Sequence, residues 1–291
     1  YESSDNGVFA SGHVRVFRQQ TLYNNDNNQT SYDWEPLGRS IAGKQEYDRM
    51  GRSMDISADG WTLAIAATQF IALHEGGPGY VQVYRYNGTD WDQLGQDLVG
   101  DADADVFGRD VALTPDGNVL VVGANFADVG DIKDAGMVRV FRLVVSNNTD
   151  TDIRNSANES APETATATQY IWEQIGSDLL GTAEGDRFGN TVDISSDGTR
   201  IVVGATQRGQ GPGYVRIYEL DEELDDWKQV PLDGSLLQGD SMDVRFGSEI
   251  QLSGIDSNVL AVGIIASDAN GDDSGKVQVF QYTAASNSQV S

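Results

Sequence analysis

A block of about 57 residues, the spacing from Trp34 to Trp91, recurs four times along this chain. This repetition limits the possible folds more than any other feature. Each block carries four landmarks in fixed order: a Trp followed by a Gly, an aromatic or Met directly before a Gly, a strand ending in small residues, and a Gly-x-Val-x-Val strand. The middle two are clearest in FGRDVALTPDGNVLVVGA from Phe107 and FGNTVDISSDGTRIVVGA from Phe188.

The landmarks predict four short strands in every block. Segments such as VQVYRY alternate apolar and polar side chains, whereas VLVVGA and IVVGA are continuous apolar runs, typical of strands covered on both faces. Between the second and third strands lie the Asp-Gly pairs of SADGWT, TPDGNV and SSDGTR. They indicate tight hairpins, because Gly accepts a positive φ. One four-stranded unit cannot bury both faces of its sheet, so copies must stack, and radial stacking gives a β-propeller.

We therefore expect an all-β fold, a β-propeller of four-stranded blades, in a single domain over residues 1–291. A stacked solenoid is the alternative, although its repeats are usually shorter. One extra strand, GHVRV from Gly12, precedes the first block, so that four full repeats plus one strand are visible and the propeller is expected to be larger than this chain. The repeats are placed at residues 18–84, 85–141, 171–218 and 219–280.

The long spacing between Trp91 and Trp172 has a compositional cause. Residues 146–169 are polar, rich in Ser, Thr, Asn and Ala, and lack an apolar period. They are interpreted as an inserted polar loop.

Charge and composition narrow the classes of partner. The chain has 45 acidic and 19 basic residues and a net charge of −26, which argues against nucleic acid and anionic membranes as partners. No Cys is present, which excludes disulfides and Cys-based zinc sites. No run of 18 apolar residues occurs, so membrane insertion is not expected.

The order Phe-Gly, Asp-Gly turn, Gly-Ala and Gly-x-Val-x-Val resembles the FG-GAP repeat, which builds the β-propeller of integrin α chains and of many secreted surface proteins. The resemblance covers the chain except for 146–169 and the last residues. It implies blades packed through the repeated Trp, with the small-residue strand near the central channel. The Pro of the family motif is replaced by Thr68, Asn125, Thr206 and Ile265.

Calcium is the cofactor that this resemblance and the charge suggest. The family's D-x-D-x-D-G loop is reduced here to a single Asp-Gly at Asp59, Asp116 and Asp197, which favours plain turns. Acidic loops elsewhere are better candidates because their oxygen side chains alternate around a Gly or lie three apart. The predicted metal ligands are Asp268, Asn270, Asp272, Asp273, Asp128, Asp131 and Asp134. Asp101, Asp103 and Asp105 form a further acidic group.

Catalytic patterns are scarce. The two histidines, His13 and His74, are far apart in the sequence, and no G-x-S-x-G, H-E-x-x-H or Cys nucleophile occurs. No enzyme activity and no catalytic residue is therefore predicted. Four N-glycosylation sequons lie in expected loops, at Asn28, Asn87, Asn147 and Asn158, and favour an extracellular or cell-surface location.

These observations predict an extracellular, non-enzymatic propeller that acts as a structural, adhesion or protein-interaction module, with proteins or further copies of itself as partners. A carbohydrate-binding propeller is the alternative, in which Tyr80, Phe126 and Tyr214 would stack on glycans. A propeller hydrolase or lyase is the weaker third reading.

Overall fold

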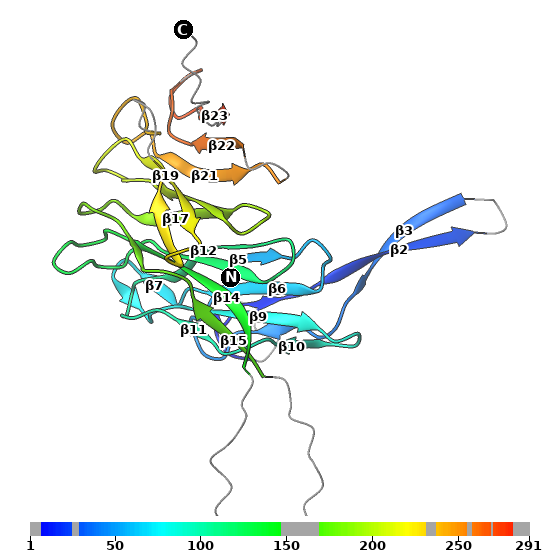
Figure 1. Cartoon of the computed structure of the whole chain (residues 1–291). Coiled ribbons are helices and arrows are strands. Elements are labelled where there is room, and N and C mark those ends of the chain that lie inside the picture. Colours follow the sequence, from blue (N-terminus) through cyan, green and yellow to red (C-terminus); the bar gives the residue numbers. More distant parts are fainter. Residues whose placement is uncertain are drawn as a thin grey trace, which may run out of the picture.

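The computed structural model describes residues 7–24, 29–146, 169–230, 237–254, 258–268 and 270–281. This part of the chain is all-β, with no helix, and its antiparallel sheets stack face to face as the blades of a β-propeller (Figure 1). The predicted fold class is therefore confirmed. Since the described residues hold no helix, they also hold none long and apolar enough to cross a membrane.

Within the described ranges, three blades have four strands in sequential order, and a fourth has three. The first contains β5 (Met50–Ile56), β6 (Thr62–Ala67), β9 (Tyr80–Tyr86) and β10 (Trp91–Gln93). The second contains β12 (Phe107–Leu113), β13 (Val119–Ala124), β14 (Met137–Ser146) and β15 (Gln169–Gln174). The third contains β17 (Phe188–Ile194), β18 (Arg200–Ala205), β19 (Tyr214–Asp221) and β20 (Asp226–Gln229). The fourth contains β21 (Phe246–Leu252), β22 (Val259–Ile264) and β23 (Lys276–Gln281).

Short strands complete the sheets. β11 (Leu98–Val99) pairs with β9, β16 (Leu179–Leu180) pairs with β14, and β7 (Phe70–Ala72) forms a small hairpin with β8 (Glu75–Gly76). At the N-terminal end, β1 (His13–Val14) pairs with β4 (Ile41–Ala42), and β2 (Phe17–Asn24) pairs with β3 (Gln29–Pro36) in a hairpin that projects from the body in Figure 1. The extra N-terminal strand predicted from the repeats is thus present.

The sequence repeat and the blade are out of phase. A block begins at the Trp of an outer strand, such as β10, and ends at the third strand of the next blade, such as β14. Each block therefore contributes strands to two neighbouring sheets and connects them covalently. The first strands β5, β12, β17 and β21 lie next to one another in that order and line the propeller axis.

Close backbone contact between blades explains why Phe-Gly and Gly-Ala recur. A Cβ on Gly123 would lie 2.1 Å from the carbonyl oxygen of Gly189, and one on Gly204 would lie 2.4 Å from that of Gly247. The small-residue strand of one blade therefore touches the Phe-Gly strand of the next, near the axis as predicted, and a side chain there would force the sheets apart.

Three of the four repeated Trp residues pack between neighbouring blades, as predicted, whereas Trp34 is 61% exposed. Trp91, Trp172 and Trp227 are buried, and each indole Nε1 donates a hydrogen bond to a main-chain carbonyl in the preceding Trp motif, at Leu37, Leu94 and Ile175 respectively. Large buried aromatic area combined with a satisfied N–H makes these contacts strong determinants of stability.

The Asp-Gly segments form the expected hairpin turns. In the first, Gly60 has a φ of +76°, and the carboxylate of Asp59 accepts bonds from the Ser57 hydroxyl and from the main-chain N–H of Trp61. Asp116 and Asp197 have the same role in the next two blades. Their oxygens are thus engaged within the turn.

Candidate functional site

Six arginines converge on one cavity where the axial strands begin. The cavity has a volume of about 390 Å³. Its guanidinium-bearing residues are Arg49, Arg52, Arg109, Arg187, Arg208 and Arg245. They are six of only 19 basic residues in a chain with a net charge of −26. Positive charge that is scarce overall and gathered in one hollow is the electrostatic feature most indicative of a binding site here.

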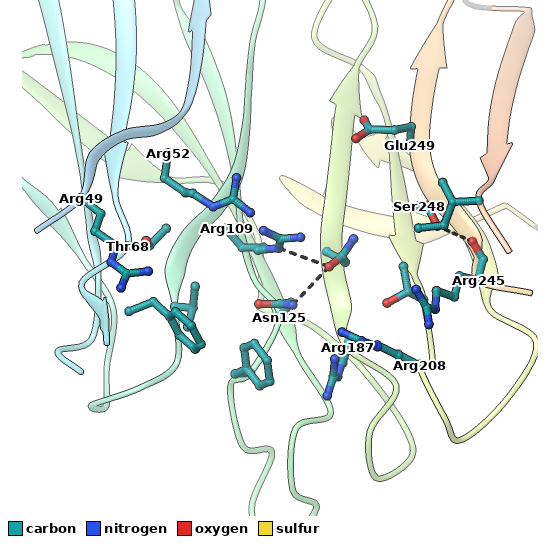
Figure 2. A pocket seen from close by; sticks show the side chains of 16 residues that line it. Arg49, Arg52, Thr68, Arg109, Asn125, Arg187, Arg208, Arg245, Ser248 and Glu249 are labelled. Carbon is teal, nitrogen blue, oxygen red and sulfur yellow. Dashed lines mark hydrogen bonds between the residues drawn. The ribbon is translucent and has the colours of Figure 1, made fainter. Parts of the chain in front are cut away.

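The repeat itself places these side chains. Arg49, Arg187 and Arg245 each directly precede the aromatic-Gly or Met-Gly landmark, and Arg52 and Arg109 directly follow it. Because the landmark opens every axial strand, its two flanks face the axis at the same level in neighbouring blades. Arg208, from the loop after β18, completes the set (Figure 2).

The backbone before each axial strand is left-handed. The φ angles of Arg49, Arg187 and Arg245 are +53°, +54° and +58°, and Val106, at the same position in the second blade, has +60°. The conformation therefore belongs to the turn, not to arginine. A non-Gly residue in this region costs of order 1 kcal/mol or more, so the turn fixes these side-chain directions at an energetic cost.

A hydrogen-bonded core lies beneath the arginines. Arg109 Nε donates to Asn190 Oδ1 at 3.2 Å, and the Asn125 amide nitrogen donates to the same oxygen at 3.2 Å (Figure 2). Since a guanidinium can only donate, this contact identifies the Asn190 oxygen, and the shared oxygen in turn orients the Asn125 amide. The carbonyl oxygen of Asn125 must therefore point the other way.

Three buried polar atoms at the cavity have no hydrogen-bond partner among the described residues: Asn125 Oδ1, Thr68 Oγ1 and Arg187 Nε. Asn125 and Thr68 are only 3% and 1% exposed. A buried polar atom without a partner costs about 1–3 kcal/mol, so such atoms are uncommon in folded proteins. Here three of them line one charged cavity, which indicates a ligand that supplies the missing partners.

Carboxylates neutralise little of this charge. Within the described part of the chain, Arg245 is the cavity arginine with an ion pair, at 3.5 Å from Nε to Asp243 Oδ1. Burial, followed by repulsion from Arg52, lowers the pKa of Arg109, against the attraction of Asp110 and Glu249. Burial also lowers the pKa of Arg187, and repulsion from Arg208 and Arg245 acts in the same direction, against the attraction of Asp134. The guanidiniums are therefore packed together and only partly compensated.

An aromatic pair forms one wall. Phe70 and Phe126 stack with ring centroids 6.2 Å apart, and both line the cavity. The Arg49 guanidinium lies 5.7 Å from the Phe70 ring centre, and that of Arg187 lies 4.9 Å from the Phe126 ring centre. These cation–π contacts orient the two guanidinium planes without using their N–H groups, although Arg49 Nη2 also donates to the Ile71 carbonyl oxygen at 3.5 Å.

Buried carboxylates bridge the axial strands below the cavity. Asp110 accepts bonds from Ser53 Oγ and from the main-chain N–H of Val192, and Asp193 accepts one from the N–H of Leu252. Burial raises the pKa of Asp110, and it raises the pKa of Asp193 to about 6. These acids hold neighbouring blades in register.

Two of the predicted acidic groups meet in a second hollow of about 620 Å³. Asp101, Asp103 and Asp105 lie there with Asp128 and Asp134, together with His74, Lys133 and Glu184. Asp128 pairs with Lys133 and accepts the main-chain N–H of Asp134 at 3.0 Å, and Asp105 caps its own loop at the N–H of Ala102. These contacts give several of the carboxylates partners other than a metal.

The structure does not assemble a metal cage from these loops. Among the described residues, no three His, Cys, Asp or Glu side chains form a group that could hold a metal ion. In the last blade, Asp268 Oδ1 accepts the N–H of Asp273, and the Asn270 N–H bonds to Ser274, so this loop closes on itself. Asp131 and Asp272 are not brought into a shared metal cluster. Calcium binding stays a prediction.

Two of the three aromatic residues that were predicted to stack on glycans, Tyr80 and Tyr214, do not present an exposed ring. Tyr80 is 6% exposed and donates its hydroxyl to Asp48 at 2.6 Å, and Tyr214 donates to Asp186 at 3.0 Å. Each hydroxyl thus bonds to a buried carboxylate just before the first strand of its own blade. Burial is the main cause of the raised pKa of both tyrosines. Phe126 instead lines the arginine cavity.

One predicted glycosylation site can be placed. Asn87 is exposed in the turn between β9 and β10, where its Nδ2 donates to Asp92 and its Oδ1 accepts the N–H of Thr89. Asn28, Asn147 and Asn158 lie outside the described residues, as does 147–168 of the insert.

Comparison with known proteins adds no family. No family model matches the chain, and no curated protein matches it. Among solved structures, the periplasmic gluconolactonase PpgL of Pseudomonas aeruginosa is similar at 13% identity with a TM-score of 0.49, over 93% of this chain and 64% of the enzyme. Atg21 in its complex with the Atg16 coiled coil is similar at 11% identity with a TM-score of 0.47, over 96% of this chain and 63% of Atg21. A protein named as a 6-phosphogluconolactonase, from Bacteroides uniformis, is similar at 15% identity with a TM-score of 0.41, over 78% of this chain and 50% of that protein.

These findings correct the predicted function. The chain spans less than two thirds of the length of these structures, and at such identities the likeness concerns the fold. Propeller lactonases recur among the similar structures, and none of those described above supports an extracellular structural or adhesion role. The predicted function as a structural, adhesion, protein-interaction or carbohydrate-binding module is therefore withdrawn. The extracellular location and the lack of enzyme activity are untested and stay predictions. The FG-GAP resemblance is untested and stays a prediction.

The sequence contains a signal for the cavity that motif searching missed. Aligning the landmarks gives RMGR, VFGR, RFGN and RFGS, starting at residues 49, 106, 187 and 245. Arginine thus flanks the landmark five times in a strongly acidic chain. The positions that replace the family's Pro, among them Thr68 and Asn125, line the same cavity.

Proposed function

We propose that this propeller binds a small oxyanion, a phosphate or carboxylate compound, in the cavity lined by its six axial arginines. The observation that carries the proposal is the coincidence of six guanidiniums, only partly compensated by carboxylates, with three buried polar atoms that lack partners among the described residues, in one cavity. Arginine presents a rigid fork of donors that matches the oxygens of carboxylate and phosphate.

The cavity has the size and setting of a ligand site. Its volume of about 390 Å³ falls in the usual range for small-molecule pockets. Arg109, Arg187 and Arg245 are half-buried at its base, whereas Arg49, Arg52 and Arg208 are exposed at its rim. The rim charges would attract an anion, and the base charges would bind it where water competes less.

Titration calorimetry tests this proposal. The wild-type chain is titrated with pyrophosphate and with citrate in low salt, beside Arg109→Gln. The control is Arg142→Gln, because Arg142 lies on β14 with its partner Asp225 and away from the cavity. A charge-assisted bond contributes about 1.5–3 kcal/mol, so Arg109→Gln should weaken binding roughly 10- to 100-fold and Arg142→Gln should not change it. Equal affinity in all three proteins would refute the proposal.

A further inference from the structure

The cavity arginines fall into two groups with a neutral zone between them. Repulsion from Arg52 acts on Arg109, and repulsion from Arg208 and Arg245 acts on Arg187, so these sets are close neighbours; Arg187 repels Arg109 as well, but less than Arg52 does. Figure 2 shows Arg49, Arg52 and Arg109 on one side, Arg187, Arg208 and Arg245 on the other, and Asn125 between them. We name these sides the Arg109 pole and the Arg187 pole.

Each pole has the charge and the donors to bind one anionic group. At the Arg109 pole three guanidiniums face Asp110 and Glu249, which attract Arg109. At the Arg187 pole three guanidiniums face Asp134, which attracts Arg187, and Asp243, which pairs with Arg245. Either pole therefore keeps a net positive charge. A phosphate offers three terminal oxygens to three guanidiniums, whereas a carboxylate offers two, so phosphate is the better match.

The zone between the poles requires hydrogen-bond donors. Asn125 Oδ1 is a buried acceptor without a partner, and its orientation is fixed through the oxygen that it shares with Arg109. A hydroxyl group on the middle of a ligand would satisfy this oxygen, and an apolar spacer would leave it unpaired. Thr68 Oγ1, also buried and unpartnered, lies on the Arg109 side in Figure 2 and can donate to a group bound there.

From these three observations we infer that the ligand is a small polyhydroxylated molecule with a phosphate group at each end, one bound at each arginine pole. This inference rests on the proposed oxyanion site and specifies its ligand class. Two groups held on one scaffold bind far more tightly than either alone, because the second group binds without a further loss of translational freedom.

The test compares probes that differ in one feature each. Fructose 1,6-bisphosphate, fructose 6-phosphate, hexane-1,6-diol bisphosphate and citrate are titrated calorimetrically into the wild-type chain. We expect the sugar bisphosphate to bind at least 30-fold more tightly than the monophosphate and about 10-fold more tightly than the hydroxyl-free bisphosphate. Citrate binding as tightly as the sugar bisphosphate would overturn phosphate in favour of carboxylate ends.

Variants at the two poles and between them complete the design. Arg52→Gln and Arg208→Gln, both at exposed rim positions, should each bring the bisphosphate down to the affinity of the monophosphate. Asn125→Ala should remove the advantage of the sugar bisphosphate over its hydroxyl-free analogue while the bisphosphate still exceeds the monophosphate. Circular dichroism and thermal melts confirm that each variant is folded.

The outcomes separate this inference from the proposed function. If mono- and bisphosphate bind equally well, and Arg109→Gln weakens both, the oxyanion site stands and the two-pole ligand is refuted. If none of the probes binds, both fall. If the bisphosphate is preferred but only one pole variant matters, the two-pole arrangement is likewise overturned.

Discussion

Replacing Arg187 by Met should make the ligand-free protein more stable while it removes binding. The Nε atom of Arg187 is buried without a partner among the described residues, and the repulsion of Arg208 and Arg245 opposes the attraction of Asp134 for its charge. Removing an unsatisfied buried polar group recovers about 1–3 kcal/mol. Loss of the cation–π contact with Phe126 lowers the free energy of unfolding by about 0.5–1 kcal/mol. Met retains the apolar stem and the same backbone demand.

The net gain is therefore about 1 kcal/mol in the free energy of unfolding. For a chain of this size such a gain raises the melting temperature by roughly 2–4 °C. Calorimetric or fluorescence melts without ligand measure it, and Arg142→Met at the surface is the control, with a change within about 0.5 kcal/mol. If Arg187 instead stabilised the fold, its replacement by Met would lower the melting temperature. A lower melting temperature for Arg187→Met would refute the interpretation that this cavity sacrifices stability for binding.

Three further predictions concern the fold. Trp172→Phe leaves the Leu94 carbonyl unpaired and should lower stability by about 1–3 kcal/mol in urea unfolding, whereas Trp34→Phe, at a 61% exposed position, should not. Gly123→Ala forces a methyl group against the next blade and should lower the melting temperature by at least several degrees; Gly254→Ala, with 3.8 Å of room, should be near neutral. Burial raises the pKa of Asp193 in the folded state to about 6, above its unfolded value. The protonated carboxyl group therefore contributes to the free energy of unfolding. This contribution is fully present below the unfolded pKa and is lost as the pH rises through 6. Melting temperatures measured from pH 4.5 to 7.5 should fall more steeply in wild type than in Asp193→Asn, and equal slopes would contradict this.

The blades could be predicted from sequence because local rules determine them. Asp-Gly turns, apolar second strands and repeated Trp residues each have one structural solution, and the solutions agree with one another. The phase of the repeat could not be read in this way. Which strand of a block pairs into which sheet depends on contacts between blocks, such as Gly123 against Gly189, that a linear pattern does not contain.

The arginine cavity was missed for a related reason. Its residues are separated by up to about 200 positions, and only the stacking of the axial strands brings Arg49 and residues of the fourth blade such as Arg245 to opposite sides of one cavity. Acidic clusters such as Asp268–Asp273 were conspicuous because neighbours in sequence form them. A search by local spacing therefore finds those clusters and not the dispersed arginines.

The most direct test of the oxyanion site is to follow the arginine side chains themselves. In a nitrogen-15 labelled sample, the guanidinium Nε–H signals are recorded by NMR while fructose 1,6-bisphosphate is added. The account predicts large shifts, and slower exchange with solvent, for Arg109 and Arg187, with Arg142 unchanged. Shifts confined to Arg142 and other surface arginines, with Arg109 and Arg187 unaffected at saturation, would contradict it.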